Sequence, residues 1–225
     1  MNLNSTQTRF FTLASSGMFL IFAILYFCPA DVPHKISFPL FTISVSSLLL
    51  TPWQMTMGLL FSALGDYMGS CGSFIGQMGF FAIAHVWYIA YFVIRYFKKV
   101  EHDRKLTSKA KGYLAMLIIC LIGLLAVVFT RIVPCAPEGI IRTGVSVYAV
   151  LICLMLLAAM LQRSTLFALG ALLFVFSDFI LAWNRFVEPI PYHKYLIMVP
   201  YYLGQWLLFI RATSFRINSI RMFRF

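Results

Sequence analysis

The segment Leu59–Gly69, LLFSALGDYMG, has the composition of an apolar helix that carries one carboxylate. Asp66 lies inside this run, directly after Gly65. An aspartate at the centre of a membrane helix costs about 2.5–3.5 kcal/mol on insertion scales, so intramembrane carboxylates are rare and commonly functional. The rest of the chain decides whether this helix lies in a membrane.

The composition is that of an integral membrane protein. The chain has 225 residues, of which 61% are hydrophobic and 11% are charged, and its mean hydropathy is +0.88. A soluble domain carries about 25% charged residues. The apolar runs are also too long for barrel strands, which alternate in polarity over about ten residues. We therefore expect an all-α membrane protein.

Eight apolar segments are candidates for transmembrane helices, and we expect them to form one domain over residues 1–225. They are Phe10–Cys28, Ile36–Leu50, Trp53–Gly69, Ser73–Phe97, Gly112–Val133, Gly139–Leu161, Thr165–Asn184 and Tyr195–Thr213. The first is too long for a signal-peptide core and is expected to be retained. Pro52 breaks the helix between the second and third segments, which are short and could instead form a re-entrant pair.

The distribution of Lys and Arg predicts the orientation. With eight spans both termini lie on one side, together with the basic loop 98–111; this side collects 13 of the 18 Lys and Arg residues. The prediction is that both termini are cytoplasmic. The net charge of +11 is then mostly a topology signal, and no nucleic-acid partner is expected because no soluble basic domain exists.

The two halves of the chain show a short similarity. Gly58 precedes Asp66 by eight residues, and Gly170 precedes Asp178 by eight residues. In an eight-span arrangement these two helices run in the same direction, which places the two carboxylates at matched depth. The pattern indicates a 4+4 parallel internal repeat, an architecture found in other membrane proteins.

Polar residues recur at helical spacing around Asp66. A stripe of small residues on its own helix would permit close helix approach, and the next helix presents a polar face: Ser73, Gln77, Phe81, His85 and Tyr88. Such a face lines a cavity or meets the polar groups of another helix. The alternative is that Gln77 and His85 only hold helices together.

The last two apolar segments carry a second set of polar residues. Asp178 is followed by Asn184 and Arg185, and Tyr201, Tyr202 and Gln205 follow Pro200. The alternative for Asp178 is a salt bridge to Arg185 or Arg142 near the membrane edge. Two carboxyl groups sharing one pocket, one protonated and one ionised, suit acid–base catalysis, and they equally suit proton-coupled transport.

No cofactor or metal is expected. The four histidines include no pair at ligand spacing on a helix. The residues before Asp66 are Ala63, Leu64 and Gly65, so the G-x-G-D motif of intramembrane aspartyl proteases is missing.

Four stretches together resemble the YhhN-like lysoplasmalogenase family. They are LLFSALGD (59–66), FIGQMGFFAIAHVWYIAYF (74–92), GALLFVFSDFILAWNRF (170–186) and PYYLGQWLL (200–208). The resemblance implies an eight-helix membrane hydrolase that cleaves the vinyl ether bond of lysoplasmalogens. The products would be a fatty aldehyde and glycerophosphocholine or glycerophosphoethanolamine. The family's two essential acidic positions would fall on Asp66 and Asp178, and no metal would be needed.

On this interpretation the partners are a lysophospholipid, water and membrane lipids. The residues expected to orient the carboxylates or bind the substrate are Gln77, His85, Tyr88, Arg142, Asn184, Arg185, Tyr201, Tyr202 and Gln205. Arg142 or Arg185 would pair with the phosphate. We expect a bacterial cytoplasmic membrane, with the endoplasmic reticulum as the other location.

Two rival functions remain open from the sequence. A small proton-coupled transporter would have a pore reaching both faces, whereas an enzyme would have a shared pocket open to lipid. A non-enzymatic lipid-binding protein would pair both aspartates with arginines.

Overall fold

The computed structural model describes residues 3–29, 31–100 and 108–222, and all regular structure in these ranges is helical. The eight α-helices match the eight predicted apolar segments. They are α1 (Ser5–Phe27), α2 (Phe38–Leu50), α3 (Trp53–Ser70), α4 (Phe74–Val100), α5 (Ser108–Val127), α6 (Ile140–Met160), α7 (Thr165–Phe186) and α8 (His193–Met222). A π-helical turn (Val128–Ile132) and a 3₁₀ turn (Val133–Cys135) continue α5. The prediction of an all-α protein is confirmed; the middle of the predicted loop 98–111 lies outside the described residues.

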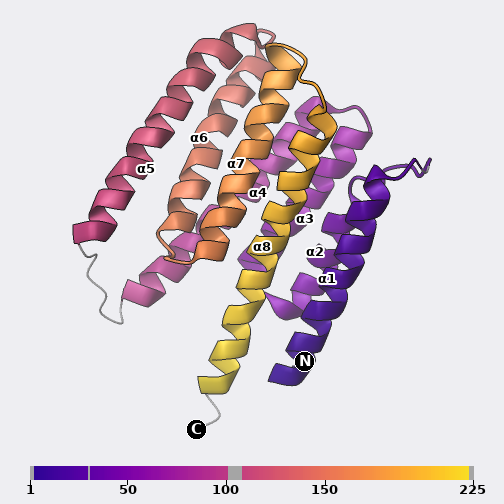
Figure 1. Ribbon diagram of the computed structural model, residues 1–225, viewed down its shortest axis with the longest axis vertical. Coiled ribbons are helices and arrows are strands. Elements are labelled where there is room, and N and C mark those ends of the chain that lie inside the picture. Colours follow the sequence, from indigo (N-terminus) through magenta and orange to yellow (C-terminus); the bar gives the residue numbers. More distant parts are fainter. Residues whose placement is uncertain (1–2, 30, 101–107, 223–225) are drawn as a thin grey trace.

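The helices form a bundle in which consecutive helices pack against each other, except α4 and α5 (Figure 1). The hairpins α3–α4 and α7–α8 are the most extensively packed pairs. Helix α4 also packs against α6, and α8 packs against α1 and α2, so the two halves of the chain are joined along these faces. The start of α1 and the end of α8 lie at the lower end of Figure 1, and the end of α4 and the start of α5 lie at its left, at the downward ends of these two helices.

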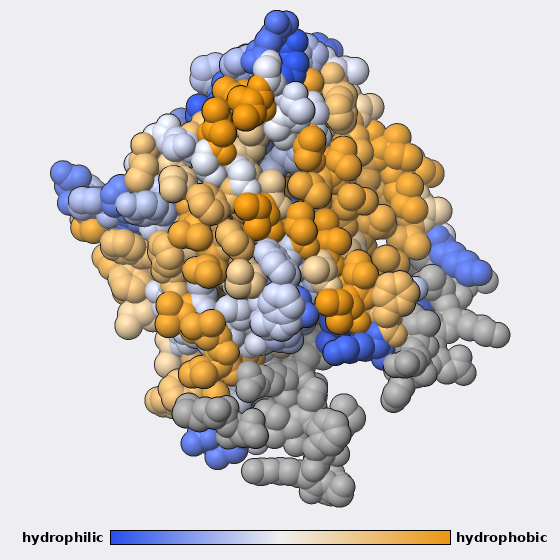
Figure 2. Space-filling view, turned by 180° about the vertical axis from the view of Figure 1, so that it is seen from behind, coloured by the Kyte–Doolittle hydropathy of each residue, from blue (hydrophilic) through white to orange (hydrophobic). Residues whose placement is uncertain are grey.

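Within the described residues, five helical stretches are long and apolar enough to cross a membrane. They are Ser5–Phe27, Phe74–Lys98, Lys111–Cys135, Ile140–Met160 and Thr165–Phe186. Large apolar side chains are exposed on the outer surface, among them Ile24, Leu48 and Ile119, and Figure 2 shows broad hydrophobic areas on one face. Water would disfavour such a surface, whereas a lipid bilayer accommodates it. The chain is a multi-pass membrane protein.

Glycines allow the closest helix contacts. An added Cβ at Gly58 would overlap the ring of Tyr88, and one at Gly170 would lie 2.9 Å from the carbonyl oxygen of Gly204. The first glycine lets a large side chain of α4 lie against α3, and the second pair lets the backbones of α7 and α8 touch. The prediction that small residues on the Asp66 helix permit close approach is therefore confirmed at Gly58.

Candidate active site

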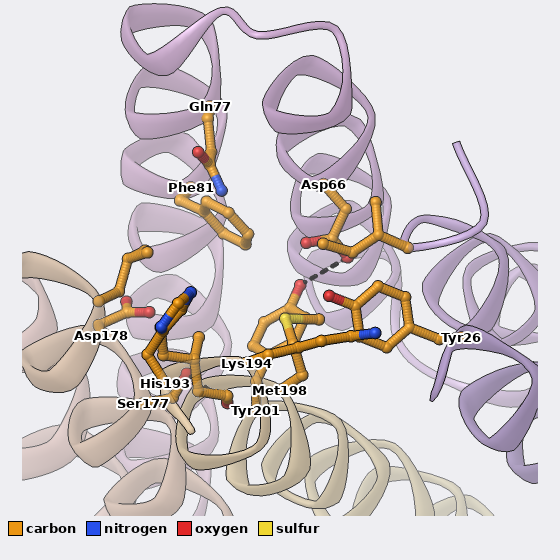
Figure 3. A pocket seen from close by; sticks show the side chains of 13 residues that line it. Tyr26, Asp66, Gln77, Phe81, Ser177, Asp178, His193, Lys194, Met198 and Tyr201 are labelled. Carbon is orange, nitrogen blue, oxygen red and sulfur yellow. Dashed lines mark hydrogen bonds between the residues drawn. The ribbon is translucent and has the colours of Figure 1, made fainter. Parts of the chain in front are cut away.

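A cavity of about 340 Å³ lies at the end of the bundle opposite the chain termini, among α1, α3, α4, α7 and α8 (Figures 1 and 3). It combines acidic, basic, amide and hydroxyl groups with apolar walls. Its lining residues are Tyr26, Ile36, Asp66, Gln77, Phe81, Ser177, Asp178, Leu181, His193, Lys194, Ile197, Met198 and Tyr201. A concave, mostly apolar site with a few convergent polar groups is the usual form of a small-molecule site.

Asp66 reaches this cavity from α3 and is almost completely buried. The hydroxyl of Tyr201, on α8, donates a hydrogen bond to its Oδ2 over 2.9 Å. A Cβ at Gly65 would lie 3.0 Å from the ring of Phe81, so the glycine before the acid makes room for a ring of the cavity wall. The sequence motif therefore positions both the carboxylate and its surroundings.

Asp178 reaches the same cavity from α7 and is half-buried. The hydroxyl of Tyr148, on α6, donates a hydrogen bond to its Oδ2. Asp178 also borders two smaller clefts of about 50 and 60 Å³ with almost entirely apolar walls. It thus lies where the polar cavity meets apolar space.

The two carboxylates project from opposite walls of the cavity (Figure 3). Neither forms a salt bridge with an arginine in the described residues. Arg142 pairs with Glu138 over 3.1 Å, and the guanidinium of Arg185 lies 4.0 Å from the centre of the Phe74 ring. The alternative of a salt bridge from Asp178 to Arg142 or Arg185 is therefore wrong, and neither arginine lines the cavity.

Several residues expected to bind substrate instead join helices. The Tyr88 hydroxyl donates to Oε1 of Gln205 over 2.7 Å, and Nε2 of Gln205 donates to Oγ of Ser62 over 3.0 Å. This buried network connects α3, α4 and α8. The Tyr202 hydroxyl donates to the carbonyl oxygen of Ile36 over 2.8 Å. Tyr88, Tyr202 and Gln205 therefore make hydrogen bonds between segments of the bundle and do not line the cavity.

His85 and Asn184 also lie away from the cavity wall. His85 is fully buried and its Nδ1 lies 2.7 Å from the carbonyl oxygen of Phe81, while its Nε2 has no hydrogen-bond partner among the described residues. Its ring contacts that of Tyr148, so His85 supports the tyrosine that holds Asp178. Asn184 Oδ1 accepts from the backbone N–H of Ile190 and fixes the α7–α8 connection.

Four predicted residues therefore meet at the cavity: Asp66, Gln77, Asp178 and Tyr201. The sequence interpretation missed Tyr148 and Lys194. The signal for Tyr148 is a hydroxyl within the apolar run of α6. Its partner, Asp178, follows 30 residues later, so the sequence does not indicate that the two meet. Lys194 follows directly on the start of the helix that carries Tyr201, but a single lysine at a helix end is also typical of a membrane-protein loop.

Fold and cavity together define a multi-pass helical membrane protein with two carboxylates at one internal site. Among the described residues, no group of three or more His, Cys, Asp or Glu side chains is arranged to hold a metal ion. The chain belongs to the YhhN family, which it matches over residues 35–212.

Several curated relatives are named lysoplasmalogenases. The chain is 31% identical to lysoplasmalogenase TMEM86A of Homo sapiens over 72% of its own length and 66% of the relative. It is 29% identical to lysoplasmalogenase TMEM86B of Homo sapiens over 71% of its length and 63% of the relative. The matched region thus spans slightly less than two thirds of these relatives. No solved structure matches the chain significantly.

Proposed function

We propose that the protein hydrolyses the vinyl ether bond of lysoplasmalogens, releasing a fatty aldehyde and a glycerophospho-choline or -ethanolamine. Membership of the YhhN family and the names of its relatives support the reaction class. The observation that carries the proposal concerns Asp66 and Asp178, which are 112 positions apart. They line one cavity, and each accepts a hydrogen bond from a tyrosine hydroxyl.

Vinyl ether hydrolysis needs an acid and a group that handles water. One carboxyl group gives its proton to the vinyl carbon remote from the ether oxygen, which leaves an oxocarbenium ion. The other carboxylate stabilises this cation and takes a proton from water as the water oxygen adds to the carbon next to oxygen. The hemiacetal then collapses: its C–O bond to glycerol breaks, the glycerol oxygen gains a proton, and the aldehyde leaves.

The tyrosines prepare the two acids for these roles. Tyr201 donates a hydrogen bond to Oδ2 of Asp66, and Tyr148 donates one to Oδ2 of Asp178. Such a bond fixes the carboxyl plane and leaves Oδ1 available to substrate or water. Because the acids lie on opposite walls, a substrate between them has one acid on each side. Gln77, on the same wall as Phe81, is placed to bind a glycerol hydroxyl.

The rival functions receive less support. Beneath the cavity, Ser62, Tyr88 and Gln205 are fully buried and bonded to one another, and this packing is unlike a pore that continues toward the other face. A lipid-binding protein with arginine-paired aspartates is disfavoured because the cavity carboxylates bond to tyrosines instead.

We further propose one domain of eight transmembrane helices with both termini in the cytoplasm, in a bacterial cytoplasmic membrane. Support comes from the start of α1, the end of α4, the start of α5 and the end of α8, which all lie away from the cavity end of the bundle, and from the excess of Lys and Arg in the sequence next to these helix ends. The packed hairpins α3–α4 and α7–α8, each carrying one cavity aspartate, support the 4+4 repeat. The cavity would then face the extracytoplasmic side.

The test is a paired assay on purified protein. The wild type is incubated with a lysoplasmalogen and with its saturated ether analogue, and released aldehyde is measured. Aldehyde from the first lipid alone is expected. Asp66→Asn and Asp178→Asn should each lower the rate by at least about a hundredfold, because removing a catalytic proton donor or acceptor costs about 10²–10⁴ in rate. A folded variant with the native rate would refute the two-acid mechanism.

A further inference from the structure

We propose that the lysophospholipid lies across Asp178, with its phosphate at Lys194 and the start of its hydrocarbon chain in the two apolar clefts that α6 and α7 form with α4 on one side and with α5 on the other. This inference rests on the proposed function and extends it by assigning the orientation of the substrate and the residues that bind its two ends.

The polar end is defined by a cation at the cavity wall. The ammonium of Lys194 lies 4.9 Å from the centre of the Tyr26 ring and 5.7 Å from that of Phe27, and Figure 3 shows the side chain extended across the cavity toward Tyr26. Lys194 forms no salt bridge among the described residues, and His193 lines the cavity beside it. A half-buried ammonium without a carboxylate partner suits an anionic oxygen of a phosphate diester.

The arginines first expected to bind the phosphate are engaged elsewhere. Arg142 binds Glu138 and also donates to the carbonyl oxygens of Pro134 and Ala136, which fixes the connection between α5 and α6. Arg185 lies over Phe74. Because neither lines the cavity, the structure moves the phosphate subsite to the first turn of α8.

The apolar end begins at Asp178. The two smaller clefts share Val145, Tyr148, Asp178 and Ala182, and Asp178 is the one charged residue that lines either cleft. Other walls are aliphatic or aromatic, such as Leu181 in one cleft and Ile152 in the other. The clefts are too small for a whole fatty chain and accommodate the methylenes nearest the ether bond.

The order of these surfaces matches the order of groups in the lipid. A cationic wall is followed by the two carboxylates and then by apolar clefts, just as phosphate and glycerol are followed by the ether bond and the chain. A ligand laid along this gradient brings its ether bond to Asp178. The reverse orientation would bury a phosphate among apolar side chains without a counter-charge, which is strongly unfavourable.

The experiment measures binding of ligands that cannot be hydrolysed, in lipid nanodiscs. The probes are 1-O-hexadecyl-lysophosphocholine and 1-O-hexadecylglycerol, which lacks the phosphate. Lys194→Gln should weaken binding of the phosphate ligand about tenfold, the loss of one charge-assisted hydrogen bond, and leave the glycerol ether unchanged. Arg131→Gln, which removes an exposed cation outside the cavity, should change neither. Equal effects of Lys194→Gln on both probes, or no effect, would overturn the phosphate subsite.

The chain end is tested with Ala182→Phe and, as a milder change, Ala182→Leu. Both fill the two apolar clefts and should weaken both hexadecyl ligands several-fold to tenfold, with a smaller effect on butyl analogues. Val147→Phe enlarges an exposed side chain on α6 and should change neither. A loss that is independent of chain length, or no loss from either Ala182 variant, would overturn the chain assignment.

The outcome separates this inference from the proposed reaction. If the variants bind the ligands as expected but the wild type releases no aldehyde from lysoplasmalogen, the proposed reaction is refuted and the proposed orientation of the ligand still holds. Hydrolysis by the wild type, together with binding that ignores Lys194 and Ala182, would refute the orientation alone.

Discussion

At the scale of single residues, the site depends on how each carboxylate is held. Asp66 and Asp178 each receive a hydroxyl from a tyrosine of a different helix, Tyr201 and Tyr148. Hydrogen bonds to charged groups contribute about 1.5–3 kcal/mol, roughly twice as much as neutral ones. The tyrosines therefore act as positioning residues, which decide the direction in which each acid presents its second oxygen.

Tyr148→Phe is expected to lower kcat for lysoplasmalogen by about 10- to 100-fold with a smaller change in KM. The physical reason is that loss of this hydrogen bond releases Asp178 without altering the ring that packs against His85. Steady-state aldehyde release provides the measurement. Tyr113→Phe, which removes an exposed hydroxyl on α5, serves as the matched control and should keep wild-type kinetics. An unchanged kcat in Tyr148→Phe would contradict a positioning role.

At the scale of helices, glycines set how closely the elements approach. Gly170 and Gly204 face each other so closely that each added Cβ would meet the other's carbonyl oxygen, at 2.9 and 2.7 Å. Backbone atoms cannot rotate away as a side chain can, so this contact fixes α7 against α8. The same pair of helices carries Asp178, Lys194 and Tyr201, so their spacing also sets the width of the cavity.

Gly170→Ala should lower the free energy of unfolding by about 1–3 kcal/mol, the usual cost of overpacking. Gly123→Ala is the control, because an added Cβ there has no neighbour within 4 Å and alanine has the higher helix propensity. Thermal unfolding in one detergent compares the two. If both variants unfold at the same temperature, the close α7–α8 contact does not contribute to stability as expected.

At the scale of the whole molecule, polarity is distributed along the bundle axis. The cavity occupies the end of the bundle opposite the start of α1 and the end of α8. In the proposed orientation a lysophospholipid of the outer leaflet reaches the carboxylates without crossing the membrane.

Cysteine labelling tests this orientation. In a cysteine-free background, Glu188→Cys should react with a membrane-impermeant maleimide in intact cells, since Glu188 is exposed at the cavity end. Lys111→Cys, at the start of α5, should react only after the cells are permeabilised. Labelling of Lys111→Cys in intact cells would reverse the proposed topology.

The amino-acid sequence alone is sufficient to predict the class of fold and to single out the two aspartates. Apolar runs near the length of a bilayer crossing allow helices and little else, because lipid offers no partner for backbone polar groups. An aspartate within such a run is costly enough to be informative, so Asp66 and Asp178 could be found without coordinates. Gln77 and Tyr201 followed because they lie on polar helix faces.

The tertiary structure decided which polar groups share the cavity. Helical periodicity predicts a face but not the neighbour opposite it. Tyr88 and Gln205, expected at the cavity, bond helices together below it, and Tyr202 bonds α8 to the turn before α2. Tyr148 and Lys194 belong to helices far from Asp66 in sequence, and only packing brings them to the acids or the cavity. Arg142 and Arg185 contact partners that lie close to them, Glu138 and Phe74, instead of the more distant carboxylate of Asp178.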